Sequence, residues 1–150
     1  MDAMADTFPG ALVEDGRVHR RVYTDPGIFE LELRRIFGRA WLYVGHESQV
    51  PNAGDYATAS LARQPVVMVR CADGAVRVLF NRCPHRGAVV AAGRAGHVEN
   101  FRCAYHGWTF RLDGAVQSIP REEDYAGTGF DRGCADMKLL PRAASHRGFV

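Results

Sequence analysis

Four residues in two short segments could together hold a metal cofactor. Cys83 and His85 form a Cys-x-His pattern, and Cys103 and His106 form a Cys-x-x-His pattern after 17 intervening residues. Two thiolates and two imidazoles in matched pairs suit a [2Fe–2S] cluster in which one iron takes both cysteines and the other takes both histidines. We therefore predict these four residues as the ligands, with the two histidines as the points where electrons enter or leave. This chemistry is electron transfer.

A structural zinc site is the alternative for the same four residues, because two cysteines and two histidines also suit Zn²⁺. Zinc sites commonly begin with two cysteines about two to four residues apart. Here each segment mixes a cysteine with a histidine, and a single residue separates the first pair. The spacing favours the iron cluster over a zinc-stabilised interaction module. Metal analysis for iron with acid-labile sulfide, or for zinc, distinguishes them.

The residues beside the ligands fit tight loops around a cluster. Pro84 restricts one backbone dihedral in the first segment. Gly87 and Gly107 each follow a histidine closely, and a residue without a Cβ lets backbone N–H groups approach the sulfurs. Trp108 is predicted either to screen the cluster from water or to pack in the core, and one ring can do both.

Composition indicates one ordinary globular domain without a nucleic-acid or membrane surface. The chain has 150 residues, 47% of them hydrophobic and 24% charged, and its net charge is only +2. Its apolar runs are far too short to span a bilayer. Met1–Gly10 lacks the basic and then apolar pattern of a signal peptide. We therefore expect a cytoplasmic protein with reduced cysteines, in which Cys71 is a small buried hydrophobic residue.

The elements that must position the ligands begin with a helix. Residues 1–24 are predicted as an N-terminal arm, and residues 25–40 as a helix leading into the domain. Asp25 can cap this helix, and Pro26 fits its first position. Apolar residues recur at helical spacing and predict a face that packs on a core. They are Phe29, Leu33, Ile36, Phe37 and Ala40.

From residue 41 onward the pattern favours an antiparallel β domain that extends to residue 150. The run 41–45 is apolar and aromatic, and 51–55 is a loop. Two Asp-Gly turns, at 73–74 and 113–114, are each flanked by β-rich residues. Such turns are strong hairpin signals, so we expect hairpins on both sides of the ligand segments. The predicted fold is mainly β with an N-terminal helix.

The ligand segments and their surroundings resemble a known family. Cys-Pro-His-Arg-Gly at 83–87 and Cys-Ala-Tyr-His-Gly-Trp at 103–108 are similar to the Rieske domain in the large (α) subunit of ring-hydroxylating oxygenases. Segments 36–41, 44–47, 51–56 and 81–82 also resemble the N-terminal region of that subunit. The resemblance covers residues 25–150, and its motifs are specific.

The resemblance implies a small antiparallel β domain with both ligand loops at one tip. It implies electrons from NAD(P)H through a flavin reductase, a ferredoxin, or both. A mononuclear Fe(II) would then hydroxylate an aromatic ring, as a monooxygenase or dioxygenase in aromatic hydrocarbon catabolism, within an α₃ or α₃β₃ assembly. Arg86 and Tyr105 flank the histidines. They are expected to dock a redox partner or to hydrogen-bond a carboxylate across a subunit interface, with a solvated rim as the alternative.

This chain differs in two respects from proteins that carry similar motifs. Respiratory Rieske proteins carry an extra cysteine in each loop, whereas this chain has Ala88 and Ala104 at the comparable positions. This implies a reduction potential near the low end of the Rieske range, about −150 mV. The family's two-histidine, one-carboxylate iron motif lies downstream of this region. We therefore expect the N-terminal part of a longer oxygenase that by itself only transfers electrons. The alternative is a free-standing Rieske ferredoxin, which lacks the arm and helix.

Overall fold

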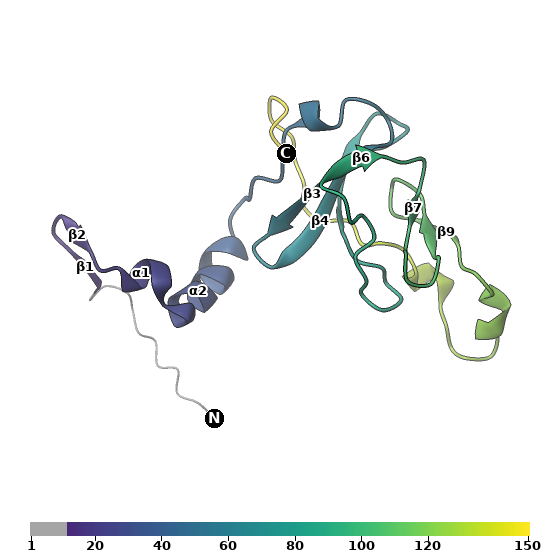
Figure 1. The fold of residues 1–150 in the computed structure, drawn as a ribbon, viewed down its shortest axis with the longest axis horizontal. Coiled ribbons are helices and arrows are strands. Elements are labelled where there is room, and N and C mark those ends of the chain that lie inside the picture. The colour runs from purple at the N-terminus through teal and green to yellow at the C-terminus, as the bar shows by residue number, and fades with distance from the viewer. Residues whose placement is uncertain (1–11) are drawn as a thin grey trace. The chain divides into compact units, whose positions relative to one another are not determined.

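The computed structural model describes residues 12–150 (Figure 1). These residues divide into two compact units, one that ends at Leu42 and one that comprises Tyr43–Val150. Part of the predicted arm, and the segment Met1–Gly10 tested for a signal peptide, lie outside the described residues. Among residues 12–150, no helix combines the length and the apolar character needed to cross a membrane.

The smaller unit contains the predicted helix. The Asp25 carboxylate accepts a hydrogen bond from the Gly27 N–H at 2.9 Å, and Pro26 is the first helical residue, as predicted. The elements of this unit, in chain order, are β1 (Val13–Glu14), β2 (Arg17–Val18), α1 (Arg21–Thr24), α2 (Pro26–Glu32) and a π-helical turn (Leu33–Phe37). The helix therefore ends in a wider turn, which Gly38 terminates.

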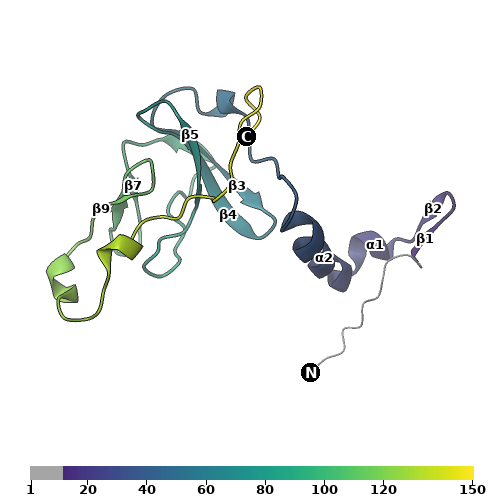
Figure 2. The same cartoon turned by 180° about the vertical axis from the view of Figure 1, so that it is seen from behind.

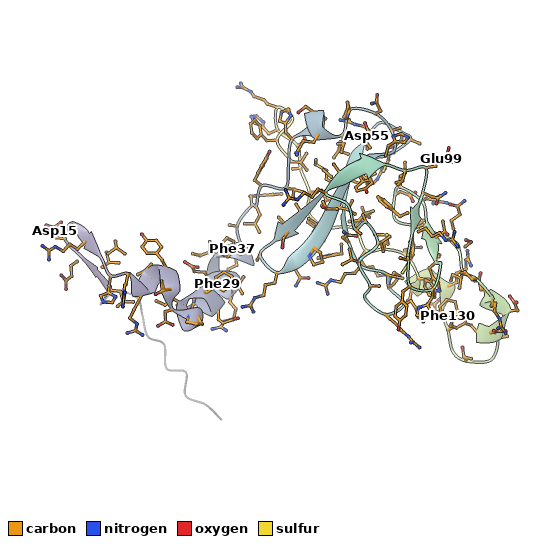
Figure 3. The ribbon with its side chains drawn as sticks, viewed as in Figure 1. Asp15, Phe29, Phe37, Asp55, Glu99 and Phe130 are labelled. Atoms are coloured by element: carbon orange, nitrogen blue, oxygen red, sulfur yellow. The ribbon has the colours of Figure 1, made fainter. Side chains whose placement is uncertain are left out.

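The apolar face of this helix is only partly covered by the described residues. No residue of α2 or of the π-helical turn is buried by the described residues. Phe29 and Phe37, labelled in Figure 3, keep 40% and 38% of their surface exposed, and Ile36 keeps 53%. The expected packing of this face on a core remains a prediction, because the smaller unit by itself leaves these side chains only partly covered.

The larger unit consists of two antiparallel sheets (Figures 1 and 2). One has four strands in the order β5-β4-β3-β6, and the other has three in the order β7-β8-β9. The strands are β3 (Asp55–Leu61), β4 (Gln64–Arg70), β5 (Val76–Phe80), β6 (Ala95–His97), β7 (Phe101–Arg102), β8 (Thr109–Phe110) and β9 (Val116–Ser118). Short 3-10 turns lie at Glu47–Gln49, Glu122–Tyr125 and Arg132–Cys134. The mainly antiparallel β fold is confirmed.

Both predicted hairpins are present. Strand β4 pairs with β5, and β8 pairs with β9, through the two Asp-Gly turns. In each turn the aspartate carboxylate, Asp73 or Asp113, accepts a hydrogen bond at 3.0 Å from the N–H two residues on. The glycines have φ of +81° at Gly74 and +91° at Gly114, a region that residues with a Cβ rarely adopt.

Strand β4 is the centre of the core because it is covered on both faces. Val67 and Val69 pack in one buried cluster with Cys83, Cys103 and Phe110 of β8. On the opposite face, alternate residues of β4 pack in a second cluster around Val50. The side chains of a strand alternate between faces, so this one strand joins both halves of the core. The two predicted thiolate ligands therefore lie directly on the core.

The last residues of the chain return to the start of the larger unit. The Val44 N–H donates to the Val150 carbonyl at 2.8 Å, and the Val150 N–H donates to the Gly45 carbonyl at 2.9 Å. In Figures 1 and 2 this yellow segment runs past the four-stranded sheet to the C-terminus. The apolar run 41–45 does not form a strand, because its pairing is limited to these bonds and one isolated bridge between His46 and Phe149.

Candidate iron–sulfur site

Two loops of the larger unit carry the predicted ligands. The first loop (residues 81–91) follows β5, and the second loop (residues 103–108) joins β7 to β8. In each, the cysteine N–H donates to the carbonyl five residues on, and the N–H of a glycine donates back to the cysteine carbonyl. These two bonds measure 2.8 and 2.8 Å in the first loop, and 2.8 and 3.0 Å in the second. Gly87 and Gly107 have φ of +73° and +76°, so the same tight turn presents each ligand pair.

A buried asparagine closes the first loop. Asn81 is 2% exposed, and its side-chain amide donates to the Ala91 carbonyl at 2.8 Å. Its side-chain oxygen accepts from the N–H groups of Val90 and Ala91 at 3.2 and 2.8 Å. These bonds satisfy a buried polar group and tie both ends of the loop together. Reasoning from sequence assigned Asn81 no positional role, although a polar residue at the end of a buried strand is a usable signal.

The fold brings the predicted ligands together in two pairs, one of thiols and one of imidazoles. Cys83 and Cys103 are each 2% exposed, and their thiols hydrogen-bond each other. The rings of His85 and His106 meet edge to face, with centroids 4.6 Å apart. His85 is half-buried and His106 is exposed, so the sulfurs lie on the core side and the imidazoles on the solvent side.

Without a metal, this environment favours neutral side chains. Burial raises the pKa of the Cys83 thiol, and the adjacent Cys103 thiol raises it further, whereas N–H groups of His85 and Arg86 act in the opposite direction. Burial also lowers the pKa of His85, with help from the nearby charges of His106 and Arg86. A neutral imidazole is the form that binds metal. A buried thiolate pair needs a compensating cation, which metal ions supply.

A single unsatisfied atom indicates what kind of group fits. Nδ1 of His85 is buried and has no hydrogen-bond partner among the described residues, a rare state for a polar atom. Two buried thiols and a free imidazole nitrogen suit a group that bonds to sulfur and nitrogen. Within residues 12–150, no three His, Cys, Asp or Glu side chains surround one point closely enough to hold a single ion. Two thiolates for one iron and two imidazoles for the other make up the ligand set of a Rieske-type two-iron cluster.

Each predicted ligand histidine also stacks on an aromatic ring of the second loop. Trp108 is 4% exposed and lies parallel to His85, with an interplanar angle of 4° and centroids 5.0 Å apart. Tyr105 stacks on His106 at 3.8 Å and 30° but is 59% exposed. Trp108 is therefore both a core residue and a neighbour of the site, whereas Tyr105 forms part of its outer edge.

Uncompensated positive charge surrounds the two loops. Arg82, Arg86 and Arg102 are exposed, and none has an ion-pair partner within residues 12–150. The segments 81–91 and 101–108 contain no Asp or Glu. A cavity of about 390 Å³ lies beside Cys83. Lys138 lines it and adds a further positive charge, and Asp136 is the one carboxylate among its lining residues. The sequence prediction named only Arg86 here: Arg82 lies in the same loop, whereas Arg102 and Lys138 come from separate segments.

Comparison with known proteins identifies the family. The family model for the Rieske [2Fe-2S] domain matches residues 40–139. The chain is 44% identical over 121 residues to the biphenyl 2,3-dioxygenase alpha subunit of Rhodococcus jostii (strain RHA1), and the match covers 79% of the chain and 26% of that subunit. It is 38% identical to the large oxygenase component of a naphthalene 1,2-dioxygenase system from Pseudomonas aeruginosa, over 86% of the chain and 29% of that component.

Solved structures agree with the sequence comparison. A naphthalene 1,2-dioxygenase from Rhodococcus sp. superposes with a TM-score of 0.83 at 31% identity, over 94% of this chain and 32% of that one. A quaternary ammonium Rieske monooxygenase superposes with a TM-score of 0.77 at 33% identity, over 87% of this chain and 35% of that one. This chain thus spans about a third or less of the length of these relatives. It belongs to the Rieske [2Fe–2S] domain family and is homologous to the N-terminal region of ring-hydroxylating dioxygenase alpha subunits.

Proposed function

We propose that this chain is the electron-transfer part of a ring-hydroxylating oxygenase. Cys83 and Cys103 bind one iron of a [2Fe–2S] cluster, and His85 and His106 bind the other. The observation that carries this proposal is that the same two loops hold a pair of buried, adjoining thiols and a buried imidazole nitrogen without a hydrogen-bond partner among residues 12–150. When bound, such a cluster accepts and releases one electron at a time.

The residues of the chain contribute to this role in distinct ways. Burial of the cysteines excludes water from the sulfur side. N–H groups of His85 and Arg86 point at the Cys83 sulfur and stabilise negative charge there. Asn81 and the two loop glycines fix the shape of the ligand loops. This limits how far the ligands move when the charge of a bound cluster changes.

The oxygenase role is favoured over a free-standing ferredoxin. The matches to alpha subunits cover 79% to 94% of the chain, so they take in more than the cluster domain alone. Relatives are named for biphenyl, naphthalene, chlorobenzene and toluate, which supports a role in the catabolism of aromatic compounds. The substrate pocket and a mononuclear Fe(II) are assigned to the part of those relatives that this chain does not match.

Anaerobic reconstitution with iron and sulfide tests this function. We expect about two irons and two sulfides per chain, and an EPR signal of mixed nitrogen and sulfur ligation after reduction. Stoichiometric zinc with no bound iron would instead support the zinc-stabilised module. A colourless chain that takes up no iron would overturn the proposed function.

The exposed residues Arg82, Arg86 and Arg102, together called the charged rim, indicate the kind of partner that this site suits. We infer that the electron donor, a ferredoxin or a flavin reductase that uses NAD(P)H, presents an acidic surface to Arg82, Arg86 and Arg102. Tyr105, exposed beside His106, adds an aromatic contact. Neighbouring alpha subunits in an α₃ or α₃β₃ assembly are the proposed acceptor side. The free thiols at Cys71 and Cys134 suit the reducing cytoplasm.

Charge reversal at the rim is expected to slow reduction by an acidic donor. In Arg86→Glu, the second-order rate of cluster reduction by a reduced acidic ferredoxin should fall about tenfold at low ionic strength. The loss should shrink as salt is added, because exposed charges are screened. Stopped-flow absorbance measures this rate.

The matched control is Arg142→Glu, which changes an exposed arginine outside both loops. Its rate should remain close to that of the unmodified chain. An equal loss in both variants, or a loss in Arg86→Glu that does not depend on salt, would show that the rim does not receive the donor.

A further inference from the structure

Among residues 12–150, no hydrogen bond orients the His85 ring, although such a bond usually orients a metal-binding histidine. In most sites the second ring nitrogen donates to a carboxylate, a carbonyl or a water, and this bond fixes the ring. Here no hydrogen bond joins the His85 ring to any of residues 12–150, and its Nδ1 is buried without a partner. Among residues 12–150, the contacts that orient this ring are therefore of another kind.

Two aromatic planes supply these contacts. The imidazole of His85 meets the edge of His106 at 4.6 Å and lies flat on the indole of Trp108 at 5.0 Å. His106 is exposed, so it is the less constrained neighbour. Trp108 is 4% exposed, and its plane is parallel to that of His85 within 4°. Simple filling of the core would not require parallel planes.

The indole is itself held by other rings. Tyr125 and Phe130 each meet Trp108 edge to face, with centroids 6.4 and 6.0 Å away. These two rings also contact each other at 4.6 Å. Figure 3 labels Phe130, which lies in the part of the larger unit that follows β9. The segment 122–130 thus sets the plane of Trp108, which in turn faces His85.

We propose that Trp108 is a positioning residue for His85. Its indole face limits rotation of the imidazole and keeps Nδ1 directed into the site before any metal binds. Such pre-organisation lowers the cost of ordering the ligand on binding. The inference rests on the proposed function only in treating His85 as a ligand. The stacking itself is a property of the chain.

The test compares three variants of the 150-residue chain after reconstitution with iron and sulfide. Trp108→Leu removes the plane but keeps an apolar side chain, and its cluster should lose iron to a chelator about 10- to 100-fold faster than the wild type, as for other residues that orient ligands. Trp108→Phe keeps a plane and should restore most of the retention. Phe101→Leu is the matched control, because Phe101 is 2% exposed in the same core but its ring contacts Tyr56 rather than a histidine.

Spectroscopy separates positioning from general packing. We expect Trp108→Leu to broaden the EPR signal of the reduced cluster, while Phe101→Leu leaves its shape unchanged. Equal iron loss in Trp108→Leu and Phe101→Leu, with unchanged EPR in both, would overturn the inference. So would iron retention in Trp108→Leu equal to that of the wild type.

A metal-free measurement keeps the inference testable if Trp108→Leu does not fold. In the NMR spectrum of the wild-type chain without metal, the indole should shift the His85 ring protons upfield, and Trp108→Phe should reduce this shift. Unshifted His85 protons in the folded wild type would overturn the inference. Failure of the wild type to bind iron and sulfide would instead refute the proposed function, and the NMR result would still decide the role of Trp108.

Discussion

Replacement of Cys83 by alanine is expected to remove bound iron and visible colour from the reconstituted chain. Removal of a residue that only orients a ligand lowers metal affinity about tenfold or more. The loss of bound iron in Cys83→Ala should be larger than this, because a ligand itself is removed. Cys103→Ala should behave in the same way. Cys71 offers no ready substitute thiolate, since burial raises the pKa of its thiol more than the neighbouring Arg77 guanidinium lowers it. Colorimetric iron and sulfide analysis with visible absorbance measures the effect.

The other two cysteines provide matched controls for this result. Cys71 is 3% exposed, close to the 2% of Cys83, so Cys71→Ala makes an equally buried change. Cys134 is exposed and donates to the Asp131 carboxylate at 3.3 Å. Both control variants should retain iron and colour. If Cys71→Ala remained folded by circular dichroism but lost its iron as Cys83→Ala does, the ligand assignment would be wrong.

Local sequence signals predicted the parts of the fold that local interactions specify. The two hairpins follow from Asp-Gly turns whose carboxylates bond to the backbone within two residues. The helix start at Asp25 follows from a similar short-range bond. Strand β3 was not predicted, because three of its seven residues are alanine or serine and a fourth is aspartate, none of which favours a strand. It is specified instead by pairing with β4 on one side and β6 on the other.

The same distinction holds for the site. The cysteine and histidine of each loop are only two or three positions apart, so their spacing can be recognised in the sequence. The stack of Trp108 on His85 joins two loops, and it depends on how the core packs the segment between them. The charged rim likewise combines Arg82, in the first loop, with Arg102, at the end of β7. Contacts of this kind arise only when the sheets bring distant segments together, which no local pattern encodes.

A comparison of two glycines tests how tightly the second hairpin is packed beneath the site. Gly74 and Gly114 occupy equivalent positions in the two Asp-Gly turns, with φ of +81° and +91°. A Cβ at Gly74 would meet nothing within 4 Å. A Cβ at Gly114 would lie 2.8 Å from Leu79 Cδ2 and 2.8 Å from the Met137 carbonyl oxygen. The two positions share the same backbone strain but differ in the space available.

Gly114→Ala is therefore expected to destabilise the larger unit much more than Gly74→Ala. Strain from the left-handed backbone costs about 1–2 kcal/mol in both variants. Overpacking adds about 1–3 kcal/mol at Gly114 alone, so the free energy of unfolding of Gly114→Ala should fall by about 2–5 kcal/mol in total. Urea denaturation, followed by the fluorescence of buried Trp108, measures both values. Equal losses in the two variants would show that the close approach at Gly114 does not constrain the fold.

The effect at Gly114 should also reach the candidate site. The Met137 N–H donates to the Gly114 carbonyl at 2.9 Å, so a displaced turn also displaces Met137. Its neighbours Asp136 and Lys138 line the cavity beside Cys83. Gly114→Ala should therefore speed the loss of iron to a chelator even in dilute urea, where the chain remains folded, while Gly74→Ala should not. Iron loss that tracks only the fraction unfolded would contradict this coupling between the hairpin and the ligand loop.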